Sequence, residues 1–139
     1  MSAQSGRRFG YSPVVLIVDN QSVLMDVLGG HPSIGNVRLV GASSGDEAKT
    51  LFEFHRPDVV VLGLPISGGI DFLQYLRTVE MPCAVIALTD SAETRQRLEA
   101  CGIEVILNRN LNLKIGKSRG ALLVWALLNA FGCRSSCTN

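Results

Sequence analysis

Apolar residues gather in five short runs along the chain, and longer, more polar segments separate these runs. The runs are rich in valine, isoleucine and leucine with few polar interruptions, which is typical of strands covered on both faces. We therefore expect strands at residues 14–18, 37–40, 59–62, 84–88 and 105–107.

The segments between the runs have the apolar spacing of helices. The first helix is expected to end at Gly29, and the second to begin at Ser43 or Ser44 with Glu47 in a capping box. The others are expected around Ile70–Leu76, at about 92–100 and at about 113–131. This alternation predicts one α/β domain, residues 13–131, with a parallel sheet between helical layers. A flexible segment (1–12) and a tail (132–139) would flank it.

Composition narrows the classes of function. A net charge of +1 over 139 residues does not suggest the basic face of a nucleic-acid-binding protein, so no direct nucleic-acid binding is expected. The first twelve residues lack the apolar core of a signal peptide, and no apolar stretch is long enough to span a membrane. We expect a cytoplasmic protein whose four cysteines are free thiols rather than a zinc site.

Polar or small residues stand where the predicted strands end. They are Asp19 and Asn20 after the first strand, Gly63 at the third, Thr89 at the fourth and Arg109 after the fifth. In open parallel sheets, binding sites lie at the carboxyl ends of the strands. Any chemistry of this chain is therefore expected at this edge.

Five stretches resemble motifs of response-regulator receiver domains, in the same order. They are Leu16–Asn20, Gly41–Ala48, Pro57–Leu62, Val85–Thr89 and Gly102–Glu104. The resemblance extends over nearly the whole of 13–131. It implies a flavodoxin-like doubly wound sheet of five parallel strands, in the order 2-1-3-4-5, flanked by five helices.

The resemblance also shows where the expected chemistry is missing. In the family, an acidic pair and an acceptor aspartate hold magnesium while the aspartate receives a phosphoryl group. Here Asp19 keeps one acid, Asn20 replaces the other and Gly63 replaces the acceptor. We therefore expect no catalytic residue, no phosphoryl transfer, and weak or absent magnesium binding.

Three further positions carry expectations from the resemblance. Thr89 matches the switch hydroxyl, although it is equally well interpreted as a helix cap. Arg109 stands in place of a lysine and is hypothesised to pair with Asp19 and Asn20, closing the pocket. Ile106 occupies the position of the aromatic residue that moves on activation in the family.

The last predicted helix is apolar on all sides, because only Asn129 is polar within residues 121–131. Such a helix needs two covered faces. We predict that Leu123, Trp125, Leu127 and Leu128 contribute to an interface for a protein partner or a second copy. This surface corresponds to the family's face of helix four, strand five and helix five. The alternative is that the tail folds back over the helix.

The leading hypothesis is a pseudo-receiver that is not phosphorylated and acts through protein–protein interaction or dimerisation. The alternative is a small-molecule sensor that uses the pocket vacated at Gly63. An enzyme is the least supported class, since no nucleophile with a base and no phosphate-binding loop is recognisable.

Overall fold

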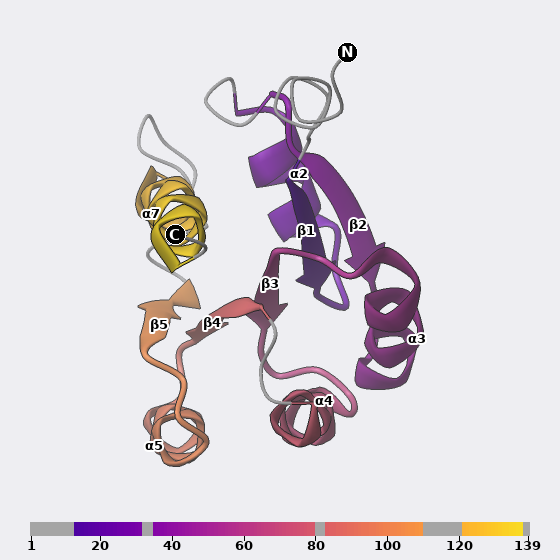
Figure 1. Cartoon of the computed structure of the whole chain (residues 1–139). Helices are drawn as coiled ribbons and strands as arrows, with labels where there is room; N and C mark the ends of the chain where they lie inside the picture. Colours follow the sequence, from indigo (N-terminus) through magenta and orange to yellow (C-terminus); the bar gives the residue numbers. More distant parts are fainter. Residues whose placement is uncertain (1–12, 32–34, 80–82, 110–120, 138–139) are drawn as a thin grey trace.

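The structure is a computed structural model that describes residues 13–31, 35–79, 83–109 and 121–137 (Figure 1). Five parallel strands form one sheet in the order β2-β1-β3-β4-β5, as the resemblance implied. The strands are β1 (Val14–Val18), β2 (Arg38–Ala42), β3 (Val59–Gly63), β4 (Ala84–Thr89) and β5 (Val105–Asn108). All five residues of the central strand β3 are buried.

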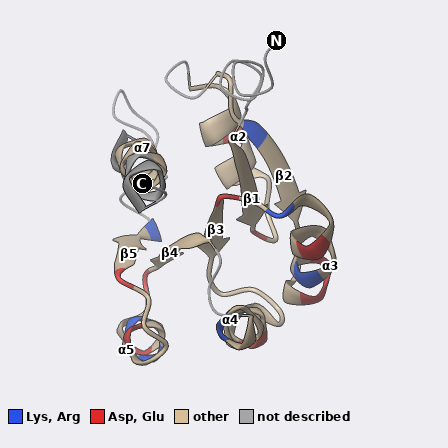
Figure 2. Ribbon diagram, in the orientation of Figure 1, with Lys and Arg blue, Asp and Glu red and all other residues tan. Residues whose placement is uncertain are grey.

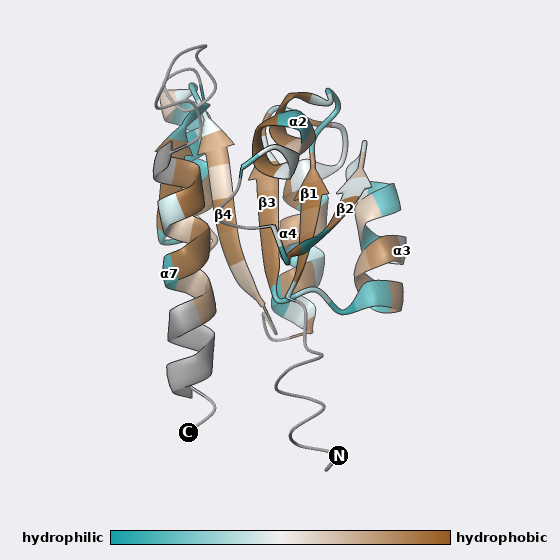
Figure 3. Cartoon of the chain, turned by 90° about the horizontal axis from the view of Figure 1, so that it is seen from above, coloured by the Kyte–Doolittle hydropathy of each residue, from teal (hydrophilic) through white to brown (hydrophobic). Residues whose placement is uncertain are grey.

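Helices cover both faces of the sheet. They are α2 (Val23–Gly29), α3 (Gly45–His55), α4 (Gly69–Thr78), α5 (Ala92–Ala100) and α7 (Ala121–Cys137). Figure 1 shows α2 and α7 on one face and α3, α4 and α5 on the other. Because side chains alternate along a strand, Leu16 and Val60 pack towards α3, α4 and α5, whereas Ile17 and Val61 pack towards α2 and α7. The central strands β1 and β3 are coloured as hydrophobic along most of their length (Figure 3).

The start of α3 and the end of α5 have capping residues that helices favour. Ser44 is the N-cap of α3 and accepts a hydrogen bond from the Glu47 N–H at 3.2 Å. The Glu47 carboxylate bonds back to the Ser43 N–H at 2.7 Å and to the Ser43 hydroxyl at 2.9 Å, so the reciprocal bond falls one residue before the cap. Gly102 follows α5 with a φ of +86°, as expected for the glycine after a helix.

The last helix differs from the prediction at its end. It continues to Cys137, although we expected it to stop at Phe131 with a tail from residue 132. A glycine inside a helix costs only about 1 kcal/mol, and no proline follows Gly132 to stop the helix. The alternative in which this tail folds back over the helix is therefore wrong for residues 132–137. The predicted start near residue 113 and the segment 1–12 lie outside the described residues.

The loop after β3 is held against the start of α3. The Gly45 N–H donates to the Ser67 carbonyl at 2.7 Å, and a Cβ on Gly45 would collide with the Gly68 carbonyl. Gly68 itself has a φ of +74°. Gly45 and Gly68 thus allow the loop after β3 to lie close to the start of α3, and this contact holds the segment that follows Gly63 in place.

Candidate functional site

The carboxyl ends of β1, β3 and β5 bring Asp19, Gly63 and Arg109 together. Asp19 directly follows β1, and its N–H donates to the Ala42 carbonyl of β2 at 2.9 Å. Gly63 is the last residue of β3, and Arg109 directly follows β5. Asn20, the other member of the predicted pocket after β1, is exposed.

Arg109 and Asp19 form an ion pair across the sheet edge. Nη2 of Arg109 donates to both carboxylate oxygens of Asp19, at 3.1 Å to Oδ1 and 3.3 Å to Oδ2. The Asp19 side chain is only 2% exposed and that of Arg109 is 16% exposed. One nitrogen serves both oxygens, so the contact is not the two-nitrogen fork of an ideal bidentate pair. The predicted partnership with Asp19 is present.

The missing side chain of Gly63 makes room for this guanidinium. A Cβ built on Gly63 would lie 2.5 Å from Nη1 of Arg109, a separation that real Cβ atoms avoid. It would also lie 3.0 Å from Cδ1 of Leu24 and 3.2 Å from Oδ1 of Asp19. Nη1 is buried and finds no hydrogen-bond partner among the described residues. The space that a side chain at position 63 would enter is therefore filled by a cation of the chain itself.

Thr89 supports the turn into α5 and is not the cap of that helix. Its side chain is buried, and its hydroxyl accepts a hydrogen bond from the Ser91 N–H at 3.1 Å. Ser91 is the N-cap, and its hydroxyl accepts from the Thr94 N–H at 3.1 Å. Sequence reasoning missed Ser91, although a serine before a helix is a common cap.

Ile106 lies in β5 and packs, half-buried, against the core on the side of α3, α4 and α5. Its carbonyl accepts a hydrogen bond from Nη2 of Arg95 in α5 at 2.9 Å. Position 106 thus contributes an aliphatic side chain that packs against the core.

The four residues predicted for an interface on α7 divide between two faces. Leu123 and Leu127 are fully buried in the core against the sheet, so neither belongs to a free surface. Trp125 is 61% exposed and Leu128 is 45% exposed. Residues four apart share one side of a helix, which explains why Leu123 and Leu127 pack together.

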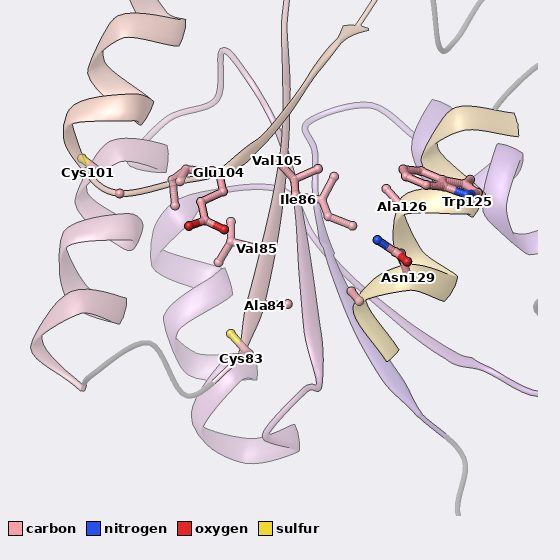
Figure 4. Close-up of a pocket in the computed structure, with 13 residues that line it drawn as sticks. Cys83, Ala84, Val85, Ile86, Cys101, Glu104, Val105, Trp125, Ala126 and Asn129 are labelled. Carbon is pink, nitrogen blue, oxygen red and sulfur yellow. The ribbon is translucent and has the colours of Figure 1, made fainter. Parts of the chain in front are cut away.

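A groove beside α7 was not foreseen from the sequence. Its volume is about 590 Å³, and it lies between the start of β4, the turn after α5, β5 and α7 (Figure 4). We call it the edge groove; its walls include Val85, Ile103, Val105, Trp125, Ala126 and Asn129. These residues come from four separate elements, so no local pattern announces the groove.

The model of the response regulator receiver domain family matches residues 15–114, well over half of the chain. This chain belongs to that family. Its strand order is the one that the resemblance implied.

The receiver domain is similar to proteins of known sequence and structure. It is 35% identical over 91 residues to the transcriptional regulatory protein KdpE of Mycobacterium tuberculosis, covering 63% of this chain and 40% of that protein. The chain thus spans about two fifths of that relative's length. The signal receiver domain of the putative Luxo repressor protein of Vibrio parahaemolyticus superposes with a TM-score of 0.72 at 19% identity, over 92% of this chain and 97% of that one. Chemotaxis protein CheY4 of Vibrio cholerae gives 0.69 at 20% identity, over 86% and 99%.

The residues of the receiver domain's site do not fit the magnesium ion that the family implies. Magnesium needs several oxygen ligands in a near-octahedral arrangement. Here the buried carboxylate, Asp19, already contacts the guanidinium of Arg109, and Gly63 supplies no side-chain oxygen. Within the described parts of the chain, no three acidic, histidine or cysteine side chains come together as a metal site. None of the helices among those residues is long and apolar enough to cross a membrane.

Proposed function

We propose that this receiver domain acts in two-component-type signalling without phosphorylation at the usual position. The observation that carries the proposal is the guanidinium of Arg109, which pairs with Asp19 and lies where the side chain of residue 63 would begin. A phosphorylated receiver needs an acceptor carboxylate and a metal at this place. Gly63 supplies no carboxylate, and Arg109 already supplies a positive charge.

The proposed mode of action is binding to another protein through the surface of α5, β5 and α7. Exposed apolar side chains lie on this surface, notably Trp125 and Leu128. The proposal includes no catalytic step and no cofactor. It also includes no contact of this chain with nucleic acid or membrane, and a cytoplasmic location in which Cys101 remains a free thiol.

The alternative, a small-molecule sensor at Gly63, has less support. A ligand would need the space beside the Gly63 Cα, but Nη1 of Arg109, Cδ1 of Leu24 and Oδ1 of Asp19 surround that position. A small molecule there would have to displace a buried ion pair, which is costly.

The test is labelling with acetyl phosphate and magnesium, read by intact mass, on the wild type and on Gly63→Asp. The wild type should remain unmodified. The variant should label weakly or not at all, because its new side chain meets Nη1 of Arg109 and because Asn20 offers no second carboxylate. A typical receiver domain that keeps its acceptor aspartate serves as the positive control. Robust labelling of the wild type, or of the variant, would contradict the proposal.

A further inference from the structure

Strand β2 has an outer edge whose backbone groups are unpaired. It is the last strand of the sheet at the end opposite to β5, and it pairs only with β1. The Arg38 N–H donates to the Pro13 carbonyl at 2.8 Å, so residues 38, 40 and 42 turn their backbone groups towards β1. Leu39 and Gly41 therefore turn theirs outward, and no residue in the described ranges bonds to these groups. We call these outward groups the β2 edge.

The opposite edge of the sheet is protected in a way that the β2 edge is not. At β5, Nη2 of Arg95 donates to the carbonyl of Ile106 at 2.9 Å. Charged side chains, prolines and bulges on an outer strand hinder pairing with a further strand. β2 contains no proline, its register with β1 is unbroken, and its single charge, Arg38, stands at the first position. Another strand can therefore pair with β2 over most of its length.

Helix α3 carries apolar side chains above the same edge. Its Lys49 lies 5.7 Å from the centre of the Tyr75 ring, and its Glu53 accepts a hydrogen bond from the Tyr75 hydroxyl at 2.6 Å, so both face α4. With 3.6 residues per turn, Leu51 and Phe54 lie on the side of α3 turned away from α4. This side is towards the outer edge of the sheet (Figure 1). Phe54 is 79% exposed, the most of any large apolar side chain in the described ranges.

We propose that the β2 edge pairs with the β2 edge of a second copy of this chain, antiparallel about a two-fold axis that passes between the two Val40 residues. Leu39 of each copy then exchanges two backbone hydrogen bonds with Gly41 of the other. The larger side chain thus faces the residue that has none. A two-fold interface needs one patch that complements itself, and this register provides it. The two sheets become one continuous sheet.

The position of α3 allows this pairing. Neighbouring strands lie about 4.8 Å apart, so the two-fold axis lies about 2.4 Å beyond β2. Because α3 packs over both β1 and β2, its axis is about 5 Å from the two-fold axis, and the two copies of α3 are about 10 Å apart. Packed helices are usually about 8–10 Å apart. Leu51 and Phe54 of both copies then fill the space between the two helices.

Charge also favours the antiparallel arrangement. It places the start of β2 beside the end of the second copy's β2, and α3 begins three residues after Ala42. Arg38 therefore lies next to the first turn of the other α3, which carries Asp46 and Glu47. Figure 2 shows the basic start of β2 and the acidic positions on α3. Arg38 forms no ion pair with an acid in the described ranges, so its charge is available to the second copy.

The first test is sedimentation of the full chain over a dilution series, which should show a monomer–dimer equilibrium. Arg38→Glu places like charges at both ends of the interface and should raise the dimer dissociation constant at least about tenfold. Arg38 is exposed, so the variant should fold as the wild type does. Arg97→Glu makes the same change of charge at an exposed position of α5. It is the matched control and should leave the dissociation constant unchanged.

The second test measures the register. In the proposed pairing the two Val40 Cα atoms are about 4.5 Å apart, within the range of about 4.4–6.8 Å that disulfides span. Val40→Cys should therefore give a covalent dimer on mild oxidation, linked through position 40 in both copies, as peptide mass mapping would show. Arg38→Cys changes the same face of β2, but its neighbour in this register is Ala42, so it should link far less. The wild type under the same oxidation corrects for the four native cysteines.

Three results would overturn the inference. They are a wild type that stays monomeric at all concentrations, a dimer that Arg38→Glu weakens no more than Arg97→Glu does, and a Val40→Cys variant that links no better than Arg38→Cys. A dimer disrupted by Trp125→Ala but not by Arg38→Glu would use the opposite end of the sheet, which would refute the inference and leave the proposed function standing. The acetyl phosphate experiment tests that function separately, since it measures labelling and not association.

Discussion

At the residue scale, Gly63 and Arg109 form one arrangement in space although they are far apart in the sequence. The guanidinium has room only because Gly63 has no Cβ, and Asp19 is paired only because the guanidinium is there. The absence of a side chain at position 63 and the placement of the Arg109 guanidinium therefore depend on each other. A substitution at Gly63 cannot be understood without considering Arg109.

This dependence predicts non-additive effects on stability. Arg109→Ala leaves the Asp19 carboxylate buried without its cation and should lower the free energy of unfolding by roughly 3 kcal/mol. Gly63→Ala forces Nη1 aside and should cost about 1–3 kcal/mol. In the double variant the shortest of the three close contacts of the new Cβ, the one with Nη1, is gone, so the loss of stability should be smaller than the sum of the two single losses. Urea unfolding of all four proteins measures the coupling.

The matched control for that cycle is Gly29→Ala. A Cβ there would lie 3.9 Å from Cδ1 of Leu39, an ordinary contact remote from the pocket. Its effect should add to that of Arg109→Ala within about 0.5 kcal/mol. Equal additivity in the Gly63 cycle would refute the steric link between Gly63 and Arg109.

At the scale of elements, local signals predicted most of the structure. The strand runs and α5, at Ala92–Ala100, were found from periodicity and flanking polar residues. The end of α7 was not found, because Gly132 resembles the glycine that ends a helix, whereas the helix continues through it to Cys137. The sequence also did not distinguish the buried face of α7 from its exposed face. A helix that is apolar all round has no periodicity that would tell Leu123 from Trp125.

The sequence predicted the ion pair of the site but not how its side chains pack. The pairing of Arg109 with Asp19 followed as a hypothesis from unlike charges at one sheet edge, and the structure contains it. The contact between Nη1 and the Gly63 position did not follow, because sequence gives charge but not the path of a long side chain. The edge groove could not be predicted either, because its walls come from four segments that are far apart in the sequence.

The cap of α3 carries a prediction about pH. Two hydrogen bonds from Ser43 lower the pKa of Glu47 below its ordinary value of 4.5. The bond from the Ser43 backbone N–H has the larger effect and the bond from its hydroxyl the smaller one. A lowered folded-state pKa means that the ionised carboxylate stabilises the fold above that ordinary value, and that this contribution is lost as the pH falls through the folded-state pKa. Glu47→Gln should therefore lower the urea midpoint at neutral pH.

The difference between Glu47→Gln and the wild type should shrink as the pH falls well below 4.5, because the wild-type carboxyl is then neutral as well. Glu99→Gln, at an exposed position in α5, is the control and should show a smaller difference at neutral pH. A Glu47→Gln difference that stays constant across the pH range would refute the charged cap.

At the scale of the whole molecule, α7 has a buried side and an exposed side. Its inner side completes the core over one face of the sheet, where Leu123 and Leu127 are fully buried. Its outer side carries Trp125 and Leu128 beside β5. Since one helix carries both sides, substitutions on the outer side can test the proposed association without disturbing the packing of the inner side on the sheet.

Adjacent leucines on α7 provide that measurement. Leu127→Ala removes a fully buried side chain and should lower the free energy of unfolding by about 2–5 kcal/mol, through lost transfer energy and a cavity. Leu128→Ala, at a 45% exposed position, should change it by no more than about 0.5 kcal/mol. Urea unfolding at a concentration where the chain is monomeric avoids the contribution of association to apparent stability. If Leu128→Ala proved as destabilising as Leu127→Ala in the monomer, the outer side of α7 would be part of the core, and no surface would remain there for a partner.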